Sequence, residues 1–534
     1  MRLFRMNFGQ TRVRLIQVGA GFVAAALIAG CGNNYRPTVT PVTPSGPPAQ
    51  PGSFAVVVSA PSTTAAGVAT IIDYSGDTIL ATASIGPGPS AFTVDETGSN
   101  GYTINTDGTL TNFPVSTTLQ TKKVAYSTLP NNARPLNLFT PSSGLWAADL
   151  CATFLPSNGC QDAADVFTGS PEALLLSIPL ASSNPVVNTP VMVMGPGLGA
   201  KRFFAISQNL VTSTNPNPTG MECNIAPAAQ PTGEATGIEI ANDTTDIPIP
   251  VGRCPVYAIE SADGQRLFVI NRGSDTVSVI NVPDNTLDNQ CPTGCVNQDG
   301  QKYFTHPTLP LSLGAVTATS ITPPNGTTGM TATAGPVYAE YNASKSLLVV
   351  ADYAGSTVSV IDVSLDEFGN DSSTFGTTYT IPVGNNPAAV TVLQDGSRAY
   401  TANQTAESIT VVNLSSYTAQ KTLPVTGHPR TVVSTQNSVF GKVYVASPDS
   451  PFLTIIATGG TSPDTVDTTL DLYSGNLVDV RVTSQNAVSG NNLNVSRIPG
   501  WGQPCNLSLT DFNPATSKNP VLSNCQAQAV SLLK

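Results

Sequence analysis

The side chains that could act in acid–base catalysis are few in this sequence. It has two histidines, His306 and His428, whereas catalysis needs an acid, base or nucleophile with a perturbed pKa held in a cleft. His428 precedes Pro429 at a repeated position where the other copies carry unrelated residues, and His306 lies in a Thr-His-Pro segment of an insertion. We therefore expect structural roles for both histidines, and the sequence predicts no catalytic residue.

Acidic and cysteine side chains could hold a metal. Two acidic groups carry oxygen atoms suited to calcium: Asp366, Glu367, Asn370 and Asp371, and further along Asp464, Asp467 and Asp471. Neither has the spacing of the Asp-x-[Asp/Asn]-x-[Asp/Asn]-Gly loop, so solvated acidic turns are expected. Cys291-x-x-x-Cys295 has no second Cys or His pair nearby, which argues against zinc. The sequence predicts no metal and no cofactor.

The other cysteines are expected to form disulfides. Eight cysteines follow Cys31 and fall into neighbours: Cys151 and Cys160, Cys223 and Cys254, Cys291 and Cys295, Cys505 and Cys525. An even number in an exported protein indicates disulfides. Many connectivities are open, and nearest-neighbour pairing is predicted because short loops close at the lowest entropic cost.

The first 30 residues have the pattern of an export signal. Four arginines and no acid precede the apolar run Val18–Ile28, which is too short to span a bilayer. The run leads into Leu27–Cys31 (LIAGC), and this segment resembles the bacterial lipoprotein signal. The resemblance implies a signal peptide over residues 1–30 and a lipidated Cys31 that anchors the chain to a membrane. An ordinary signal peptide is the alternative.

The residues after the predicted lipid anchor bear on the cellular location of the protein. Gly32, rather than Asp, follows Cys31, which under the lipoprotein resemblance favours the outer membrane in the cell envelope. Residues 31–52 hold six prolines and form a predicted extended tether. Removal of the four signal arginines takes the formal net charge from -11 to -15, which argues against nucleic acid as a partner.

Composition predicts an all-β fold. Apolar residues make up 40% of the chain and charged residues only 11%, with 45 Gly and 44 Pro. Thr, Val, Ser, Asn, Gly and Pro dominate, as in short strands joined by tight turns. A length of 534 residues exceeds one ordinary compact core, so several domains or one closed repeat architecture is required.

One short pattern recurs: an aromatic residue or Val, small β-forming residues, then Asn, Asp or Ser. It has eight copies: Val57–Ala60, Tyr102–Asn105, Trp146–Asp149, Phe204–Ser207, Phe268–Asn271, Val349–Asp352, Tyr400–Asn403 and Tyr444–Ser447. An Asp-Gly turn often precedes the pattern and an alternating strand such as Thr276–Ile280 follows it. Over residues 254–456 these units resemble the YVTN β-propeller family, most closely at Gly264–Asn281.

The resemblance implies that each unit is one four-stranded blade of a single propeller over residues 53–484. Seven prolines open predicted inner strands: Pro89, Pro135, Pro190, Pro255, Pro336, Pro387 and Pro429. Eight blades follow if Leu477–Val482 supplies the inner strand of a blade begun by Phe54–Ile85, so that the two ends close the ring. Seven blades, as in many family members, is the alternative. Residues 485–534 form a predicted C-terminal extension pinned by Cys505 and Cys525.

Two sets of residues are candidates for a functional surface on such a propeller. The ring of Asn105, Asp149, Asn271, Asp352 and Asn403 is expected to be structural, each side chain closing a turn through its own backbone. Insertions at Leu150–Pro171 and Asn209–Glu234 should interrupt second-to-third-strand turns, and Pro283–Pro310 should follow a third strand.

These features favour a lipid-anchored extracytoplasmic platform that binds a protein, peptide or glycan. The alternative is a lactonase-like hydrolase with a site in the central channel, although no His, Glu and Arg set converges in the sequence to support it.

Overall fold

The repeated segment folds into a four-stranded antiparallel sheet, as residues 255–310 illustrate. β17 (Pro255–Glu260), β18 (Arg266–Asn271) and β19 (Thr276–Asn281) pair in order, and the short β20 (Thr286–Leu287) and β23 (Thr308–Pro310) both pair with β19. Every residue of β17 and β18 is buried. Because both faces of the sheet are apolar, it is stable only when other sheets cover it on both sides.

The protein is described by a computed structural model over residues 54–116, 119, 124–129, 135–141, 144–155, 159–180, 189–195, 202–209, 232–312, 333–435 and 437–483. All of these belong to one compact unit, Gln50–Lys534. In this part of the chain, no helix has the length and apolar character needed to cross a membrane. Cys31 and the predicted signal and tether lie outside the described residues, as does the predicted extension after residue 484.

The first four blades follow in chain order. Blade 1 comprises β1 (Phe54–Ala60), β2 (Ala66–Asp73), β3 (Ile79–Pro87) and β36 (Asn476–Val482). Blade 2 comprises β4 (Pro89–Val94), β5 (Asn100–Asn105), β6 (Thr109–Pro114) and β7 (Ala125–Thr128). Blade 3 comprises β8 (Pro135–Phe139), β9 (Leu145–Leu155), β10 (Gly159–Gly169) and β11 (Glu172–Pro179). Blade 4 comprises β12 (Pro190–Met194), β13 (Arg202–Ser207), β14 (Thr232–Glu239), β15 (Thr244–Thr245) and β16 (Ile249–Arg253).

The other four complete the ring. Blade 5 is the sheet of β17 to β20 with β23, and it carries the separate hairpin of β21 (Cys295–Val296) and β22 (Lys302–Tyr303). Blade 6 comprises β24 (Pro336–Asn342), β25 (Leu347–Asp352), β26 (Thr357–Asp362) and β27 (Thr378–Pro382). Blade 7 comprises β28 (Pro387–Val392), β29 (Arg398–Asn403), β30 (Ser408–Asn413) and β31 (Thr418–Pro424). Blade 8 comprises β32 (Thr431–Ser434), β33 (Lys442–Ala446), β34 (Phe452–Ala457) and β35 (Thr465–Asp471).

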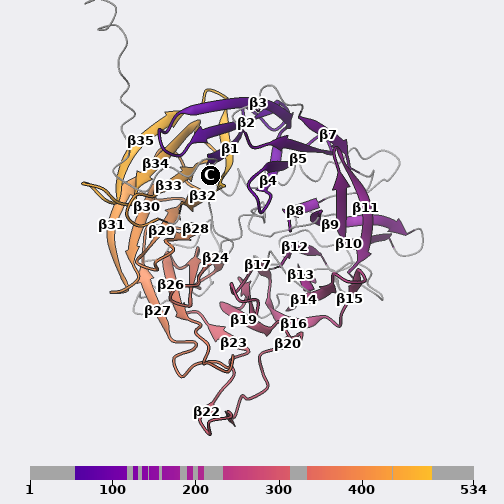
Figure 1. The fold of residues 1–534 in the computed structure, drawn as a ribbon, viewed down its shortest axis with the longest axis vertical. Helices are drawn as coiled ribbons and strands as arrows, with labels where there is room; N and C mark the ends of the chain where they lie inside the picture. The colour runs from indigo at the N-terminus through magenta and orange to yellow at the C-terminus, as the bar shows by residue number, and fades with distance from the viewer. Residues whose placement is uncertain are drawn as a thin grey trace, which may run out of the picture. The chain divides into compact units, whose positions relative to one another are not determined.

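Blade 1 closes the ring by joining segments from opposite ends of the described chain. β36 pairs antiparallel with β1, with Ala55 opposite Val482 and Val57 opposite Val480. Figure 1 shows the eight blades around a common centre, with the strands of blade 1 beside those of blade 8. The predicted all-β propeller of eight blades, closed by N- and C-terminal strands, is confirmed. Stacking blades in a closed ring leaves only short, protected sheet edges.

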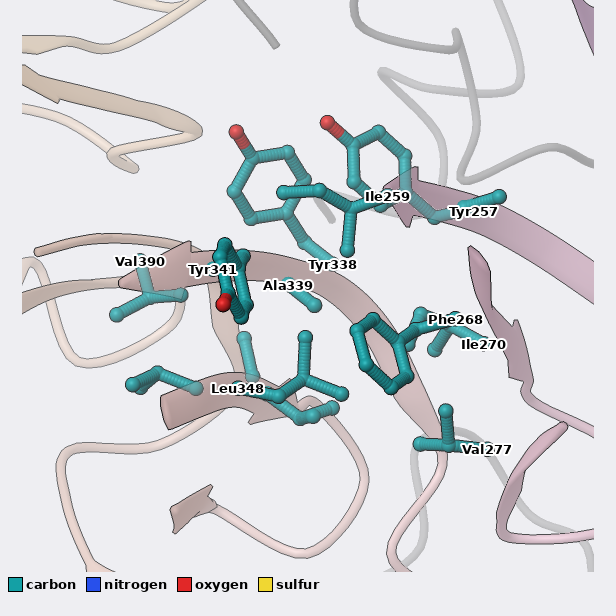
Figure 2. Close-up of a cluster of buried hydrophobic side chains, with 14 of the residues drawn as sticks. Tyr257, Ile259, Phe268, Ile270, Val277, Tyr338, Ala339, Tyr341, Leu348 and Val390 are labelled. Carbon is teal, nitrogen blue, oxygen red and sulfur yellow. The ribbon is translucent and has the colours of Figure 1, made fainter. Parts of the chain in front are cut away.

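Apolar side chains of neighbouring blades interlock between the sheets. Between blades 5 and 6 the rings of Tyr257 and Tyr338 lie 4.5 Å apart, and Phe268 stacks against Tyr341 at 6.3 Å (Figure 2). Polar side chains on the inner strands add fixed links, because the main-chain N–H of Val392 in blade 7 donates to Glu340 of blade 6 at 2.8 Å. The blades are therefore joined by both packing and directional bonds.

The ring of Asn and Asp residues is structural, but its bonds differ from the predicted ones. Asn403 donates from Nδ2 to the hydroxyls of Ser408 and Thr410, at 3.3 and 2.9 Å, on the next strand. Equivalent cross-strand bonds join Asn105 to Thr109 and Thr111, Asn271 to Thr276 and Ser278, and Asp352 to Thr357 and Ser359. For these four residues the prediction of bonds to their own backbone is wrong, because the third strand offers two hydroxyls directly across the turn.

The predicted insertions have different outcomes. Residues 150–171 are no loop at the second-to-third-strand turn: β9 and β10 continue as a hairpin to Leu155 and Gly159, and the next strand begins at Glu172. A long paired ladder satisfies the backbone groups that a loop would leave open. The second insertion does lie between β13 and β14, with residues 210–231 outside the described part. The third follows β19, as expected.

Candidate functional site

Blade 5 carries a hairpin that extends beyond the ring. β21 pairs with β22, and Asn297 closes their turn by accepting the main-chain N–H of Gln301 on its Oδ1 at 2.8 Å. Figure 1 shows β22 outside the ring, beyond β23. We call residues 288–307 the rim hairpin. It is an addition to the blade, because β20 and β23 already pair with β19 without it.

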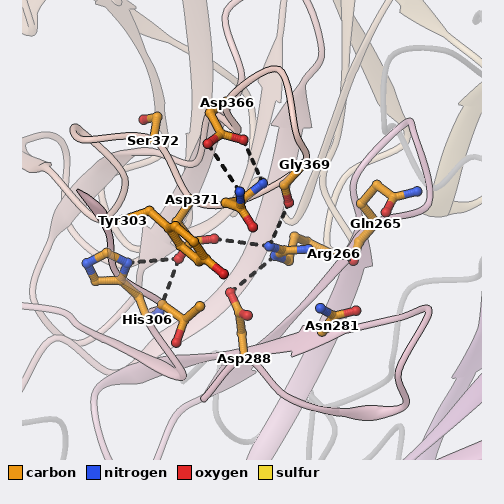
Figure 3. A network of polar contacts seen from close by, with 12 residues as sticks. Gln265, Arg266, Asn281, Asp288, Tyr303, His306, Asp366, Gly369, Asp371 and Ser372 are labelled. Carbon is orange, nitrogen blue, oxygen red and sulfur yellow. Dashed lines mark hydrogen bonds and ion pairs between the residues drawn. The ribbon is translucent and has the colours of Figure 1, made fainter. Parts of the chain in front are cut away.

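Four charged or titratable side chains tie both ends of the rim hairpin to the ring (Figure 3). The guanidinium of Arg266, on β18, lies 3.2 Å from Oδ2 of Asp288 and 3.2 Å from Oδ1 of Asp371 in the β26–β27 loop. Nδ1 of His306 lies 2.8 Å from Oδ2 of Asp371, and the His306 main-chain N–H donates to the same oxygen at 3.1 Å. Asp288 and His306 come from the two ends of the rim hairpin, so the network clamps its base.

The charges of this network are nearly balanced. Arg266, Asp288 and Asp371 are 3%, 1% and 2% exposed. Burial, together with the neighbouring charge of Asp371, raises the pKa of Asp288 to about 7, and Arg266 opposes the shift. Near neutral pH Asp288 is therefore partly protonated, while Arg266 balances Asp371.

The pairing of Arg266 with the following blade recurs at two other blade junctions. Second strands of blades 7 and 8 also begin with a basic residue that meets an acid in a third-to-fourth-strand turn of the next blade. Arg398 lies 2.5 Å from Asp464, and Lys442 pairs with Asp77. These bonds hold neighbouring blades together. The contacts particular to blade 5 are those of Asp288 and His306.

Beyond its base, the rim hairpin is braced by a disulfide. Cys291 and Cys295 are bonded, with their Cα atoms 5.4 Å apart. The main-chain N–H of Cys291 donates to Oγ1 of Thr305 at 2.9 Å, across the two arms of the hairpin. Val296 and Phe304 are nevertheless 65% and 43% exposed. The braced hairpin therefore exposes apolar side chains to solvent. A segment that only connects two strands would need neither the bracing nor the exposed apolar side chains.

The predicted solvated acidic turns are wrong for part of each group. Asp366 caps its own turn, accepting the main-chain N–H groups of Phe368 and Asn370 at 2.9 Å each. Asp371 is buried and paired with Arg266, and Asp464 is paired with Arg398. Among the described residues no group of three His, Cys, Asp or Glu side chains is placed to hold a metal ion.

Both histidines bond a carboxylate through Nδ1. His428 lies in the connection before blade 8, with Nδ1 at 2.6 Å from Oδ2 of Asp449 and Nε2 at 3.7 Å from Oε1 of Glu407. His306 differs because its partner Asp371 is fully buried while its own side chain is 35% exposed. Sequence reasoning missed the network around His306, because Arg266 and Asp371 lie 105 residues apart and belong to different blades.

Of the predicted disulfides, only one lies entirely among described side chains, and it is Cys291–Cys295. Cys254 is also disulfide-bonded. The remaining predicted positions fall outside the residues or side chains that the structure describes: Cys151, Cys160, Cys223, Cys505 and Cys525.

Comparisons with known proteins bear on the fold. The dihydro-heme d1 dehydrogenase NirN in complex with DHE is 14% identical, with 85% of this chain and 79% of that chain covered and a TM-score of 0.50. Apo AztD from Citrobacter koseri is 9% identical over 80% and 97% of the two chains, with a TM-score of 0.47. A 6-phosphogluconolactonase-like protein of Bacteroides fragilis is 12% identical over 82% and 99%, with a TM-score of 0.44.

At such identities the likeness concerns the propeller fold and brings no activity with it. No protein-family model matches the chain. No curated protein matches it either.

Proposed function

We propose that this chain is a lipid-anchored propeller of the cell envelope that binds a protein partner through the rim hairpin. The observation that carries the proposal is the hairpin's construction: it projects from a closed ring, is clamped at its base by Arg266 and Asp371, and exposes Val296 and Phe304. Preorganised apolar side chains lose little entropy on association, so a stiff hairpin binds more tightly than a loose loop.

The charges around the hairpin define the chemistry of the partner. Phe368, from the loop that packs against the hairpin base, is 38% exposed. The exposed residues Asp299 and Glu367 outnumber Lys302, the basic residue of the hairpin. A complementary surface therefore has an apolar pocket with a basic rim. The tether and lipid on Cys31 would hold the propeller near partners in the envelope.

Site-specific photocrosslinking in intact cells tests this proposal. A photoreactive residue at Val296 or Phe304 should capture one recurrent protein, and the same residue at Lys421, exposed on β31 of blade 7, serves as the matched control. Binding of that purified protein should fall at least tenfold when Phe304 is replaced by Asp. Capture of the same proteins from all three positions, or of none, would overturn the rim hairpin as the contact surface. Cys31→Ser should release the chain from the membrane fraction.

A second candidate, a hydrolase, is favoured by one observation. Asp371 holds Nδ1 of His306, whose side chain is 35% exposed, and a carboxylate-oriented, accessible imidazole is the arrangement of a general base. Hydrolysis of a panel of sugar lactones, followed by acid release, tests it. Activity that disappears in His306→Gln but survives in His428→Gln would establish the hydrolase. Equal activity in the two variants, or none in the native protein, would reject it.

A further inference from the structure

The turn between the first two strands of blade 8 departs from the repeat. In blades 5 and 7 the equivalent turns are short and polar, with Asp-Gly at residues 263–264 and 395–396. The turn of blade 8, between β32 and β33, is longer and carries Val439 and Phe440, which are 55% and 40% exposed. We call these two residues the apolar tip. Since polar turns join the same strands elsewhere in the ring, the fold does not require apolar side chains here.

Hydrogen bonds hold the apolar tip in place. Oδ1 of Asn437 accepts both main-chain N–H groups of the tip, at 2.9 and 3.0 Å. The carbonyl of Ser438 accepts from the guanidinium of Arg398 at 2.9 Å, and the carbonyl of Phe440 accepts from the hydroxyl of Tyr74 in blade 1 at 2.8 Å. Main-chain groups that are bonded in this way do not need water, which is the condition for placing a turn against lipid.

The exposed apolar surface continues onto blade 1. Lys442, two residues after the tip, pairs with Asp77 in the turn between β2 and β3. β3 then begins with Ile79 and Leu80, which are 42% and 38% exposed. Leu80 is the extra residue of a register shift in the pairing of β2 with β3, so these two neighbours do not simply alternate between a buried and an exposed side. We call the apolar tip together with Ile79 and Leu80 the docking patch.

The docking patch lies on the face where the chain enters the ring. Phe54, the first residue of β1, pairs with Asp73, the last residue of β2, and the next residue, Tyr74, bonds the apolar tip. Residues 31–53, which contain the predicted tether, precede Phe54 and reach at most about 80 Å when fully extended. A lipid on Cys31 would therefore hold this face at a high effective concentration beside the bilayer.

The charges beside the docking patch determine which lipid suits it. Lys442 is paired with Asp77, and Asp467 lies 3.7 Å from the same ammonium group with its side chain 49% exposed. Asp73, which caps the turn before β3, adds a further carboxylate. The local balance is negative, so anionic headgroups are repelled and zwitterionic headgroups are not.

We propose that the docking patch, held near the membrane by the proposed anchor at Cys31 on which this inference rests, enters the headgroup boundary of a zwitterionic lipid bilayer. Docking fixes the orientation of the ring relative to the membrane. Phe, Val, Ile and Leu side chains gain free energy when they leave water. Tyr74 beside them has a bonded hydroxyl and an apolar ring, which suits the interface. A few such side chains bind weakly alone, so docking supplements the anchor and does not replace it.

Quenching by spin-labelled lipid tests the docking. The full chain from residue 32, with a hexahistidine tag in place of Cys31, is attached to phosphatidylcholine vesicles that contain a nickel-chelating lipid. An environment-sensitive fluorescent amino acid replaces Val439 or, as the matched control, Tyr473. Tyr473 is 88% exposed and precedes β36, which starts beside Ala60, at the end of β1 opposite the chain entry. The probe at position 439 should be quenched at least threefold more strongly than the probe at position 473.

Substitutions and lipid composition sharpen the test. Phe440→Ser should reduce quenching at position 439 at least threefold, whereas Ile247→Ser, which removes an exposed apolar side chain of blade 4, should leave it unchanged. Replacement of half of the phosphatidylcholine by phosphatidylglycerol should weaken the quenching. Thermal unfolding of each variant verifies that the ring is intact.

Several outcomes would overturn the docking patch. They are equal quenching at positions 439 and 473, native quenching in Phe440→Ser, and stronger quenching with phosphatidylglycerol, which indicates electrostatic adhesion. Blue-shifted emission from position 439 without vesicles would also overturn it, because protein would then already cover the patch. Absence of lipid on Cys31 would instead refute the proposed anchor alone, since the tag supplies the attachment in this experiment.

Discussion

Replacement of Asp352 by Asn should stabilise the propeller, and the gain should grow with pH. Asp352 occupies the position that is Asn in blades 2, 5 and 7, and it is fully buried. Its Oδ2 accepts from Ser359 at 2.7 Å and from Thr357 at 3.2 Å, while Oδ1 has no partner within the described structure. Burial raises the pKa of Asp352 to about 8, although the two hydroxyls oppose the shift.

The sign of the effect follows from this raised pKa. In the unfolded chain the pKa of this carboxyl is about 3.9. The stability that the protonated Asp352 contributes is therefore fully present below that pH and is lost as the pH rises towards 8. The loss is about 1.4 kcal/mol per pH unit in this window, or about 4 kcal/mol at neutral pH. Asn does not titrate, and its amide can donate to both hydroxyls as Asn403 does. Asp352→Asn should therefore gain about 3 kcal/mol more at about pH 7 than at about pH 5.

Urea unfolding followed by intrinsic fluorescence at the two pH values measures this difference. Asn403→Asp is the matched control, because it places a carboxyl beside Ser408 and Thr410 in blade 7. It should destabilise the ring, and more so at the higher pH. A gain from Asp352→Asn that is equal at both pH values, or an Asn403→Asp variant as stable as the native protein, would refute the account of the ring of Asn and Asp residues.

Three further substitutions test contacts between blades and within the rim hairpin. Arg266→Gln leaves the buried carboxylates of Asp288 and Asp371 without their cation and should lower the free energy of unfolding by about 3 kcal/mol in urea; a change below about 1 kcal/mol would contradict the clamp. Gly384, between blades 6 and 7, is the site of the second substitution. Gly384→Ala should lower the free energy of unfolding by about 1 to 3 kcal/mol in the same assay, because its Cβ would lie 2.6 Å from Nδ2 of Asn403. Unchanged stability would show that blades 6 and 7 separate easily. Cys295→Ser removes the disulfide, so hydrogen exchange over residues 291–305 should become faster by the equivalent of about 2 kcal/mol. The melting temperature of the ring should stay unchanged. If the melting temperature fell as well, the hairpin would be part of the ring's core.

The repeated features of the fold were predictable from the sequence. A recurring tetrapeptide indicated eight blades, and the alternating residues of Leu477–Val482 identified the closing strand of the blade that has no opening proline. Pro429, predicted to open the inner strand of blade 8, lies just before β32, which begins at Thr431. The structural role of residues such as Asn271 was also predictable, because the same residue type recurs at one place in several copies. Their partners could have been found as well, since Thr276 and Ser278 follow at a spacing that other blades share.

Where the chain deviates from the repeat, predictions from local sequence patterns were wrong. Residues 150–171 were predicted as an insertion, yet β9 and β10 pair through Leu155 and from Gly159, with one register shift between Gln161 and Ala163. Pairing with a partner strand decides strand length, and local propensity is only a weak guide to it.

The sequence by itself determined what each blade does with its own residues: where strands begin, which side chains close turns, and how many units the ring needs. These are short-range properties, governed by strand periodicity and turn chemistry within about 50 residues of chain. Only the tertiary structure decided which side chains meet between blades. Arg266 reaches Asp371, and Tyr74 reaches the main chain of Phe440, because two sheets pack face to face at a particular angle. That angle is set by side-chain volumes across the whole interface, and no local pattern encodes it.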